Sequence, residues 1–166
     1  MTAKAGKYLT FELCGHMYAI AIDIVASIVN EWGHISPVPE FPDYGVGAMP
    51  FAGYVIPVID PRIRMNMPAA RDAKTTCLVV VNTGGDGEND GGSGGMVGLT
   101  VDTIHTIMDF EEEGMCEAPL LTANTSGYIT GVYKAPGSII LIIDPRLLLT
   151  DDMNEAFDNY VNTRKG

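Results

Sequence analysis

Histidines, serines and a repeated Asp-Pro-Arg triplet are the parts of this sequence whose side chains could take part in catalysis or metal binding. The histidines His16, His34 and His105 are not spaced as His-Glu-x-x-His or as any other compact set of metal ligands. No serine is expected at the strand-to-helix turn that presents a hydrolase nucleophile, because the Gly-x-Ser-x-Gly match around Ser93 lies in a glycine-rich stretch that leads into a predicted strand. The sequence therefore predicts no catalytic residue, no metal site and no cofactor, and we do not expect an enzyme.

Asp60 and Asp144 each precede a proline and an arginine at the end of an apolar stretch. Two carboxylates could act as an acid and a base if the fold brought them together. Aspartate in this position more commonly accepts hydrogen bonds from backbone amides and so caps a turn. We therefore expect the capping role.

Residues 84–95 form a glycine-rich segment without any apolar residue, which predicts a flexible loop between two strands. A phosphate-binding loop would need a lysine and a following helix, and both are missing. Asp86, Glu88 and Asp90 would also repel phosphate. These oxygen ligands suit calcium better, but a single copy without regular ligand spacing does not predict a calcium site.

The composition is that of a globular protein of the reducing cytoplasm. Of the 166 residues, 46% are hydrophobic and 19% are charged, and the formal net charge is −11. This acidity disfavours nucleic acids and anionic membrane surfaces as partners. No apolar run approaches the roughly 20 residues that span a bilayer, so no direct membrane insertion is expected. Cys14, Cys77 and Cys116 lie far apart and include no Cys-x-x-Cys pair.

The apolar pattern of the chain occurs twice. Asp23 and Asp102 occupy matching places 79 residues apart, and Asp60 and Asp144 occupy matching places 84 residues apart. An insertion of five residues within the second copy accounts for the change of offset. The pattern predicts two similar substructures whose mutual arrangement underlies the function. The repeat cores are residues 17–64 and 96–148.

Alternating or β-branched apolar residues predict strands in both copies. Tyr8–Leu13 alternates in polarity and is expected to be half-buried, whereas Thr75–Asn82 is expected to be buried on both sides. Pro57 lacks a backbone donor, which places Tyr54–Ile59 at a sheet edge or a bulge. The segment 24–29 fits either one helical turn or a bulged strand. The other predicted strands are Met17–Ile22, Met96–Val101, Tyr128–Val132 and Ser138–Ile143.

The tail, residues 150–166, has apolar residues at helical spacing, including Met153 and Phe157. Asp152 and Glu155 resemble a capping box. We predict a helix packed on the body of the protein, with a partner-binding helix as the alternative.

Two copies of short strands with little helix predict an all-β protein. Because closing a sheet removes its exposed edges, two small barrels lying side by side are the economical arrangement. Tyr8–Leu13 and Thr75–Asn82 fall outside the repeated cores, so we expect these two strands to cross between the barrels.

Several segments resemble, in order and spacing, the CheW family of bacterial chemotaxis coupling proteins. They are Y-L-T-F-E-L, Y-A-I-A-I-D-I-V, V-P-x-F-P-x-Y, G-x-x-x-x-x-G-x-V-I-P-V-I-D, V-G-L-T-V-D and Y-I-T-G-V. The resemblance implies a CheW-like domain over residues 8–149, made of two intertwined five-stranded SH3-like barrels. It also implies a non-catalytic cytoplasmic scaffold that joins the cytoplasmic tip of chemoreceptors to the regulatory domain of the chemotaxis histidine kinase.

Two positions depart from the pattern of this family. Ala52 stands where the family carries the arginine of N-L-R-G, and Ser27 stands where it carries the glutamate of V-x-E-I. Losing both charges should leave the fold intact and change the choice of partner, since a charged interface anchor can dominate binding. Met49, Phe51 and Tyr54 could supply a more apolar contact, or could simply pack in the core. The candidate partner-binding residues are Ser27, Met49, Phe51, Ala52 and Tyr54.

Two other functions are compatible with these residues. The chain could be a divergent pseudo-coupler, or an adaptor for another kinase, that has lost the standard receptor contact. It could also bind a small ligand in the cleft between the barrels, with the glycine-rich loop as a lid or calcium site.

Overall fold

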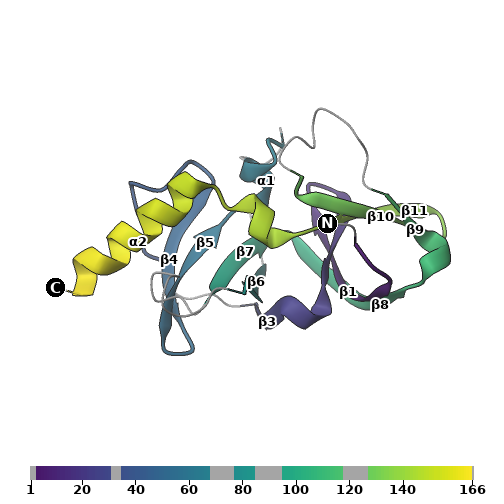
Figure 1. Ribbon diagram of the computed structural model, residues 1–166, viewed down its shortest axis with the longest axis horizontal. Coiled ribbons are helices and arrows are strands. Elements are labelled where there is room, and N and C mark those ends of the chain that lie inside the picture. The colour runs from purple at the N-terminus through teal and green to yellow at the C-terminus, as the bar shows by residue number, and fades with distance from the viewer. Residues whose placement is uncertain (1–2, 31–34, 68–76, 85–94, 118–126, 166) are drawn as a thin grey trace.

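The computed structural model describes residues 3–30, 35–67, 77–84, 95–117 and 127–165. Two β-sheets lie side by side, and one long helix packs beside the five-stranded sheet (Figure 1). The five-stranded sheet has the order β3 (Val25–Val29), β6 (Cys77–Asn82), β7 (Met96–Val101), β5 (Tyr54–Ile59) and β4 (Gly45–Phe51). The six-stranded sheet has the order β8 (Thr103–Phe110), β1 (Gly6–Leu13), β2 (His16–Ala21), β11 (Ser138–Ile143), β10 (Ile129–Ala135) and β9 (Met115–Cys116).

The helices are short except at the C-terminal end. They are α1 (Pro61–Arg64), α2 (Asp151–Lys165) and the 3₁₀ turns Ile22–Ile24, Glu112–Gly114 and Pro145–Leu148. No helix in the described ranges is long and apolar enough to cross a membrane.

Each barrel combines strands from both copies of the repeat. The five-stranded sheet joins β3, β4 and β5 of the first copy to the hairpin β6–β7, while the six-stranded sheet joins β8, β10 and β11 to the hairpin β1–β2. β1 pairs with β8, and β6 pairs with β3. The prediction of two intertwined barrels, with these two strands crossing between them, is confirmed.

The repeat extends to the register of the strands. Val58 pairs in parallel with Gly98, and the equivalent residues Ile142 and Ala19 pair in the same way. The register of β4 against β5 shifts near Gly45, and that of β10 against β11 shifts at the matching place. Both barrels therefore bend at equivalent positions, as expected where a bulge helps a small sheet to close.

The largest hydrophobic core lies between the two barrels. β1 contributes Leu9, Phe11 and Leu13 to this core. On the opposite face of the strand, Tyr8 packs in the interior of the six-stranded barrel. The prediction that this strand is half-buried is wrong, because one face lines a barrel and the other lines the junction. Buried Thr10 is accommodated because its hydroxyl donates to the carbonyl oxygen of Thr106 at 2.7 Å.

Strand β6 is buried on both faces, as predicted. Val79 and Val81 face the core between the barrels, and Leu78 and Val80 face the interior of the five-stranded barrel. The two barrel interiors are small clusters, so each barrel depends on the shared core for much of its stability.

Two local predictions are settled by the backbone. Ile22–Ile24 forms a 3₁₀ turn, and β3 follows with a register shift between Val25 and Ser27, so the bulged-strand alternative is the one observed. β5 is not an edge strand, since it lies between β7 and β4. Pro57 is tolerated there because β5 pairs with β7 at Val58 and Ile59, beyond the proline.

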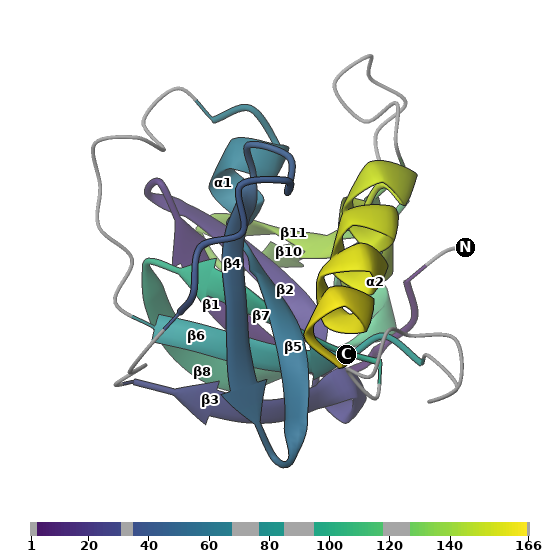
Figure 2. The same ribbon diagram turned by 90° about the vertical axis from the view of Figure 1, so that its left-hand side faces the viewer.

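Helix α2 packs on the segment before β4, as the packing interpretation of the tail predicted (Figure 2). The rings of Phe157 and Phe41 lie 6.5 Å apart, and Met153 is buried in the shared core. The helix begins at Asp151, so Asp152 lies inside the first turn and the predicted capping box is wrong. The chain before the helix is held instead by Thr150 and Tyr44, whose hydroxyl oxygens lie 2.8 Å apart.

Candidate partner-binding site

The Asp-Pro-Arg triplets cap equivalent corners of the two barrels. Asp60 accepts a hydrogen bond from the backbone amide of Arg62 (2.9 Å), and Asp144 accepts one from that of Arg146 (3.1 Å). Each arginine side chain also donates to both oxygens of its own aspartate. The predicted capping role is confirmed for both aspartates.

The first corner ties one barrel to the other. The Arg62 side chain is 5% exposed, and its Nη1 donates to Asp102 Oδ1 at 3.1 Å. The other oxygen of Asp102 accepts the backbone amide of Cys14 at 2.7 Å. Because Cys14 belongs to the β1–β2 turn, this chain of contacts links the end of β5 in one barrel to the β1–β2 hairpin of the other. The hydrogen bond with Asp60 raises the pKa of Arg62, burial opposes this change, and the guanidinium stays charged.

The second corner is open. The Arg146 side chain is 50% exposed and pairs with Asp144 alone among the described residues. Burial raises the pKa of Asp144, but hydrogen bonds from Arg146 and its positive charge outweigh burial and leave the pKa below its usual value. Asp23, the repeat equivalent of Asp102, is exposed.

A cation–π contact joins the two copies near the centre of the molecule. The Arg64 guanidinium lies 5.8 Å from the ring centre of Tyr44 and 5.6 Å from that of its repeat equivalent Tyr128. Arg64 Nε also donates to the carbonyl oxygen of Leu148 at 2.6 Å. This arginine therefore contacts equivalent residues of both copies of the repeat.

No metal centre emerges in the part of the chain that the structure describes, since no three His, Cys, Asp or Glu side chains gather there. His105 Nε2 lies 2.8 Å from Glu12 Oε2 on the surface of the β1–β8 pair. The calcium hypothesis concerns the glycine-rich loop, and residues 85–94 lie outside the described ranges.

The candidate residues of the β4–β5 hairpin divide between surface and core. Ala52 and Tyr54 are exposed at the tip, with Tyr54 at 43%. Phe51 is half-buried against the interior cluster of the five-stranded barrel, and Met49 belongs to that cluster. A partner reaching this hairpin would therefore meet Ala52 and Tyr54 directly, while Met49 holds the strand beneath them.

Ser27 lies on β3, which stands at the opposite end of the strand order from β4. It pairs with Val80 and faces the barrel interior, where it is half-buried. Val29, two residues along the same face, packs on the same cluster as Phe51. β3 and the hairpin thus belong to the same barrel, at opposite ends of its strand order.

Two further exposed apolar side chains, which the sequence prediction did not include, lie on these strands. Val55 is 40% exposed beside Tyr54, and Ile28 is 42% exposed beside Ser27. The alternation of β3 and β5 could have identified both, because each occupies the outward position of its strand. We refer to Ala52, Tyr54 and Val55 as the hairpin surface.

The tip of the β4–β5 hairpin has a left-handed backbone. Ala52 has φ 50° and Gly53 has φ 82°, which is typical of the type I′ turns that join two twisted strands. A residue with a Cβ atom tolerates this conformation poorly. In the equivalent β10–β11 turn, Pro136 occupies the place of Ala52, and proline fixes φ at a negative value. The two tips thus differ in shape as well as in side chains.

Two intertwined SH3-like barrels define the fold class of this protein. The sequence profile described as the CheW-like domain matches residues 7–153. The chain therefore belongs to the CheW-like domain family, the coupling scaffolds of chemotaxis signalling.

Relatives match along nearly their whole length. The chemotaxis protein CheW of Bacillus subtilis is 29% identical over 160 residues, which cover 94% of this chain and 96% of that protein. CheW of Klebsiella aerogenes is 23% identical over 158 residues, covering 95% and 89%. The crystal structure of the scaffolding protein TtCheW from Thermoanaerobacter tengcongensis superposes with a TM-score of 0.73 at 24% identity, covering 90% of this chain and 92% of that one.

Proposed function

We propose that this protein is a non-catalytic cytoplasmic scaffold that couples the cytoplasmic tip of chemoreceptors to the regulatory domain of the chemotaxis histidine kinase. The observation that carries this proposal is the family match over residues 7–153, which includes every described strand of both barrels except the first residue of β1. Coupling of this kind needs binding surfaces and no reacting groups, and the corners that hold paired charges are explained by turn capping.

The repeat gives this protein two related but chemically different hairpins, and this difference supports two different partners. The β4–β5 tip presents Tyr54 and Val55. The β10–β11 tip presents Lys134 and Ile139 as exposed side chains. We propose that one partner contacts the hairpin surface and the other contacts a separate face, each burying about 1,000 to 1,600 Å².

We further propose that residues 8–149 form the coupling domain. Repeat cores 17–64 and 96–148 supply its barrels, and residues 84–95 serve as a loop between β6 and β7. Residues 150–166 contribute the helix that covers the segment before β4, where Phe41 contacts both Phe157 and Tyr160.

The alternative is a divergent coupler whose standard receptor contact has been lost. Ala52 at the exposed tip motivates it, because the family resemblance places an arginine there. Neither Ala52 nor Ser27 can form the charged pair that the resemblance implies, so any receptor contact here has to be mainly apolar.

We predict that Ala52→Arg strengthens binding to a receptor-tip fragment by about thirtyfold, because a charged anchor at an exposed interface position contributes about 2 kcal/mol. Isothermal titration calorimetry of the variant and the unchanged protein against the same fragment measures this ratio. Ala52→Gly is the matched control. It removes the unfavourable left-handed conformation, should stabilise the fold by about 1 kcal/mol, and adds no charge.

Equal receptor affinity for the alanine, arginine and glycine forms would show that the receptor does not contact this tip. A gain in both variants would assign the effect to the shape of the turn and not to the charge.

A further inference from the structure

The two Asp-Pro-Arg corners are built alike, but only one of them is filled. At the first corner Nη1 of Arg62 donates to Asp102, and at the second corner Arg146 lines a cavity. We propose that this cavity binds the carboxylate of a small acid with a short apolar body, held by Arg146 as Asp102 is held by Arg62.

The first corner provides the template for this ligand. Arg62 donates Nε and Nη2 to Asp60 and still donates Nη1 to a second carboxylate, that of Asp102. A guanidinium already paired with one aspartate therefore accepts another carboxylate in this fold. At the second corner Arg146 uses Nε and Nη2 on Asp144 in the same way, which leaves Nη1 to take the corresponding ligand.

The strand register shows that the two corners correspond residue by residue. In one hairpin Leu13 pairs with His16. In the other, the backbone amide of Thr83 donates to the carbonyl oxygen of Gly95, the repeat equivalent of His16. Thr83 therefore matches Leu13, and the residue that follows it matches Cys14. That residue is Gly84, whose amide donates to Asn82 Oδ1 and not to a carboxylate. The chain's own equivalent of Asp102 is Asp23, which is exposed and is not paired with Arg146 in the described structure.

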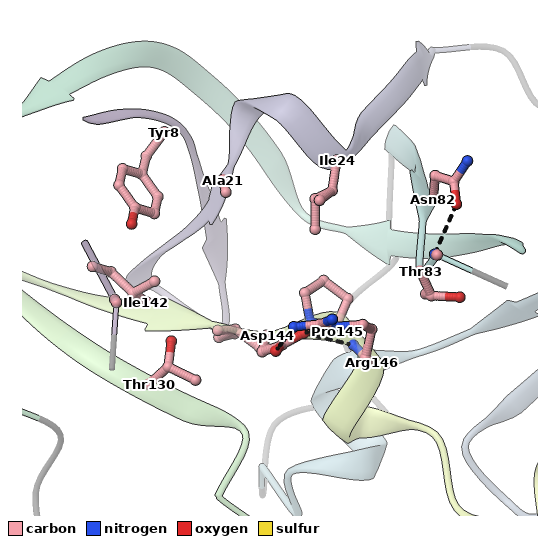
Figure 3. A pocket seen from close by; sticks show the side chains of 13 residues that line it. Tyr8, Ala21, Ile24, Asn82, Thr83, Thr130, Ile142, Asp144, Pro145 and Arg146 are labelled. Atoms are coloured by element: carbon pink, nitrogen blue, oxygen red, sulfur yellow. Dashed lines mark hydrogen bonds and ion pairs between the residues drawn. The ribbon is translucent and has the colours of Figure 1, made fainter. Parts of the chain in front are cut away.

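The cavity lies between the barrels and has a volume of about 280 Å³. Tyr8, Ala21 and Ile24 line one side, and Ile142, Thr130 and Arg146 line the other (Figure 3). Carbon-rich walls beside one cation suit a short aliphatic acid better than an inorganic anion. The Thr130 hydroxyl, which has no partner in the described structure, can donate to the second carboxylate oxygen.

The size of the expected affinity follows from the small number of contacts. A ligand of seven heavy atoms should bind with a dissociation constant of about a millimole per litre. Since a hydrogen bond to a charged group is worth more than a neutral one, losing the guanidinium should weaken binding by about tenfold or more.

The test is a titration of the full chain with 3-methylbutanoate, followed by the backbone amide NMR signals of Gly84 and Thr130. The acid should shift both signals, and the isosteric amide, 3-methylbutanamide, should not. Arg146→Gln should weaken binding of the acid by about tenfold or more. Thr130→Val should weaken binding of the acid less than Arg146→Gln does. Lys134→Gln removes an exposed cation elsewhere and should leave the affinity for the acid unchanged.

Shifts of equal size with the amide, an undiminished response in the folded Arg146→Gln variant, or no shift with any acid would each overturn the proposal. N-acetylglutamate α-amide, titrated in parallel, represents an acidic side chain of a partner protein. Tighter binding of this probe than of 3-methylbutanoate assigns the carboxylate to a protein partner, and the reverse order assigns it to a free metabolite.

Discussion

Replacing Arg62 by alanine is expected to lower the free energy of unfolding by about 3 to 5 kcal/mol. The substitution leaves the buried carboxylate of Asp60 without its cation and releases Asp102 from the link to the β1–β2 turn. Taking one member out of a buried charge network costs more than the network contributes as a whole, because the remaining charges stay desolvated. Urea unfolding followed by circular dichroism measures the loss.

Arg146→Ala is the matched control, since it removes the same residue from the same triplet in the other copy. The Arg146 side chain is half-exposed and water can solvate Asp144 after the change, so the cost should be no more than about 1 kcal/mol. Similar losses in the two variants would contradict the account of one closed and one open corner.

Gly47→Ala is expected to destabilise the protein by about 3 kcal/mol. A Cβ atom at Gly47 would lie 2.3 Å from the carbonyl oxygen of Ser36 and 2.8 Å from a methyl carbon of Ile35. That carbonyl accepts the amide of Ala48 at 2.9 Å, so relieving the clash breaks the bridge between β4 and the segment before it. Thermal or urea unfolding measures the change.

Gly131→Ala is the repeat-matched control for this substitution. Its Cβ would meet the side chain of Ala3, at 2.9 Å, and not a backbone carbonyl oxygen, and Ala3 lies in the segment before β1, where its amide donates one hydrogen bond to the carbonyl oxygen of Thr130. We expect a cost of about 1 kcal/mol. A loss at Gly131 as large as that at Gly47 would show that the backbone contact to Ser36 is not what requires glycine.

The internal repeat made the architecture predictable, because its offsets carry through to the register. The 84-residue offset between Asp60 and Asp144 relates corners that the structure shows to be capped alike. The burial of β1 was not predictable from alternation. Polarity along a strand does not reveal that a second barrel covers its other face, and Thr10 is buried there because a carbonyl oxygen accepts its hydroxyl proton.

The hairpin surface was predictable only in part. Turn residues located the tip and hence the exposure of Ala52. The sequence around Met49 does not distinguish an exposed side chain from the buried one that the structure shows. The difference between Arg62 and Arg146 was hidden for another reason. Identical triplets behave differently because a further partner comes from elsewhere in the chain, and among the described residues a second aspartate, Asp102, reaches the arginine only at the first corner.

The central claim is that this chain links two different proteins, and calorimetric titration tests it most directly. The unchanged protein is titrated against the regulatory domain of the chemotaxis kinase, against a receptor-tip fragment, and against each with the other already bound. Coupling predicts binding of both at about micromolar affinity, with the second still binding when the first is saturating. Binding of neither partner, or of one only in place of the other, would contradict it.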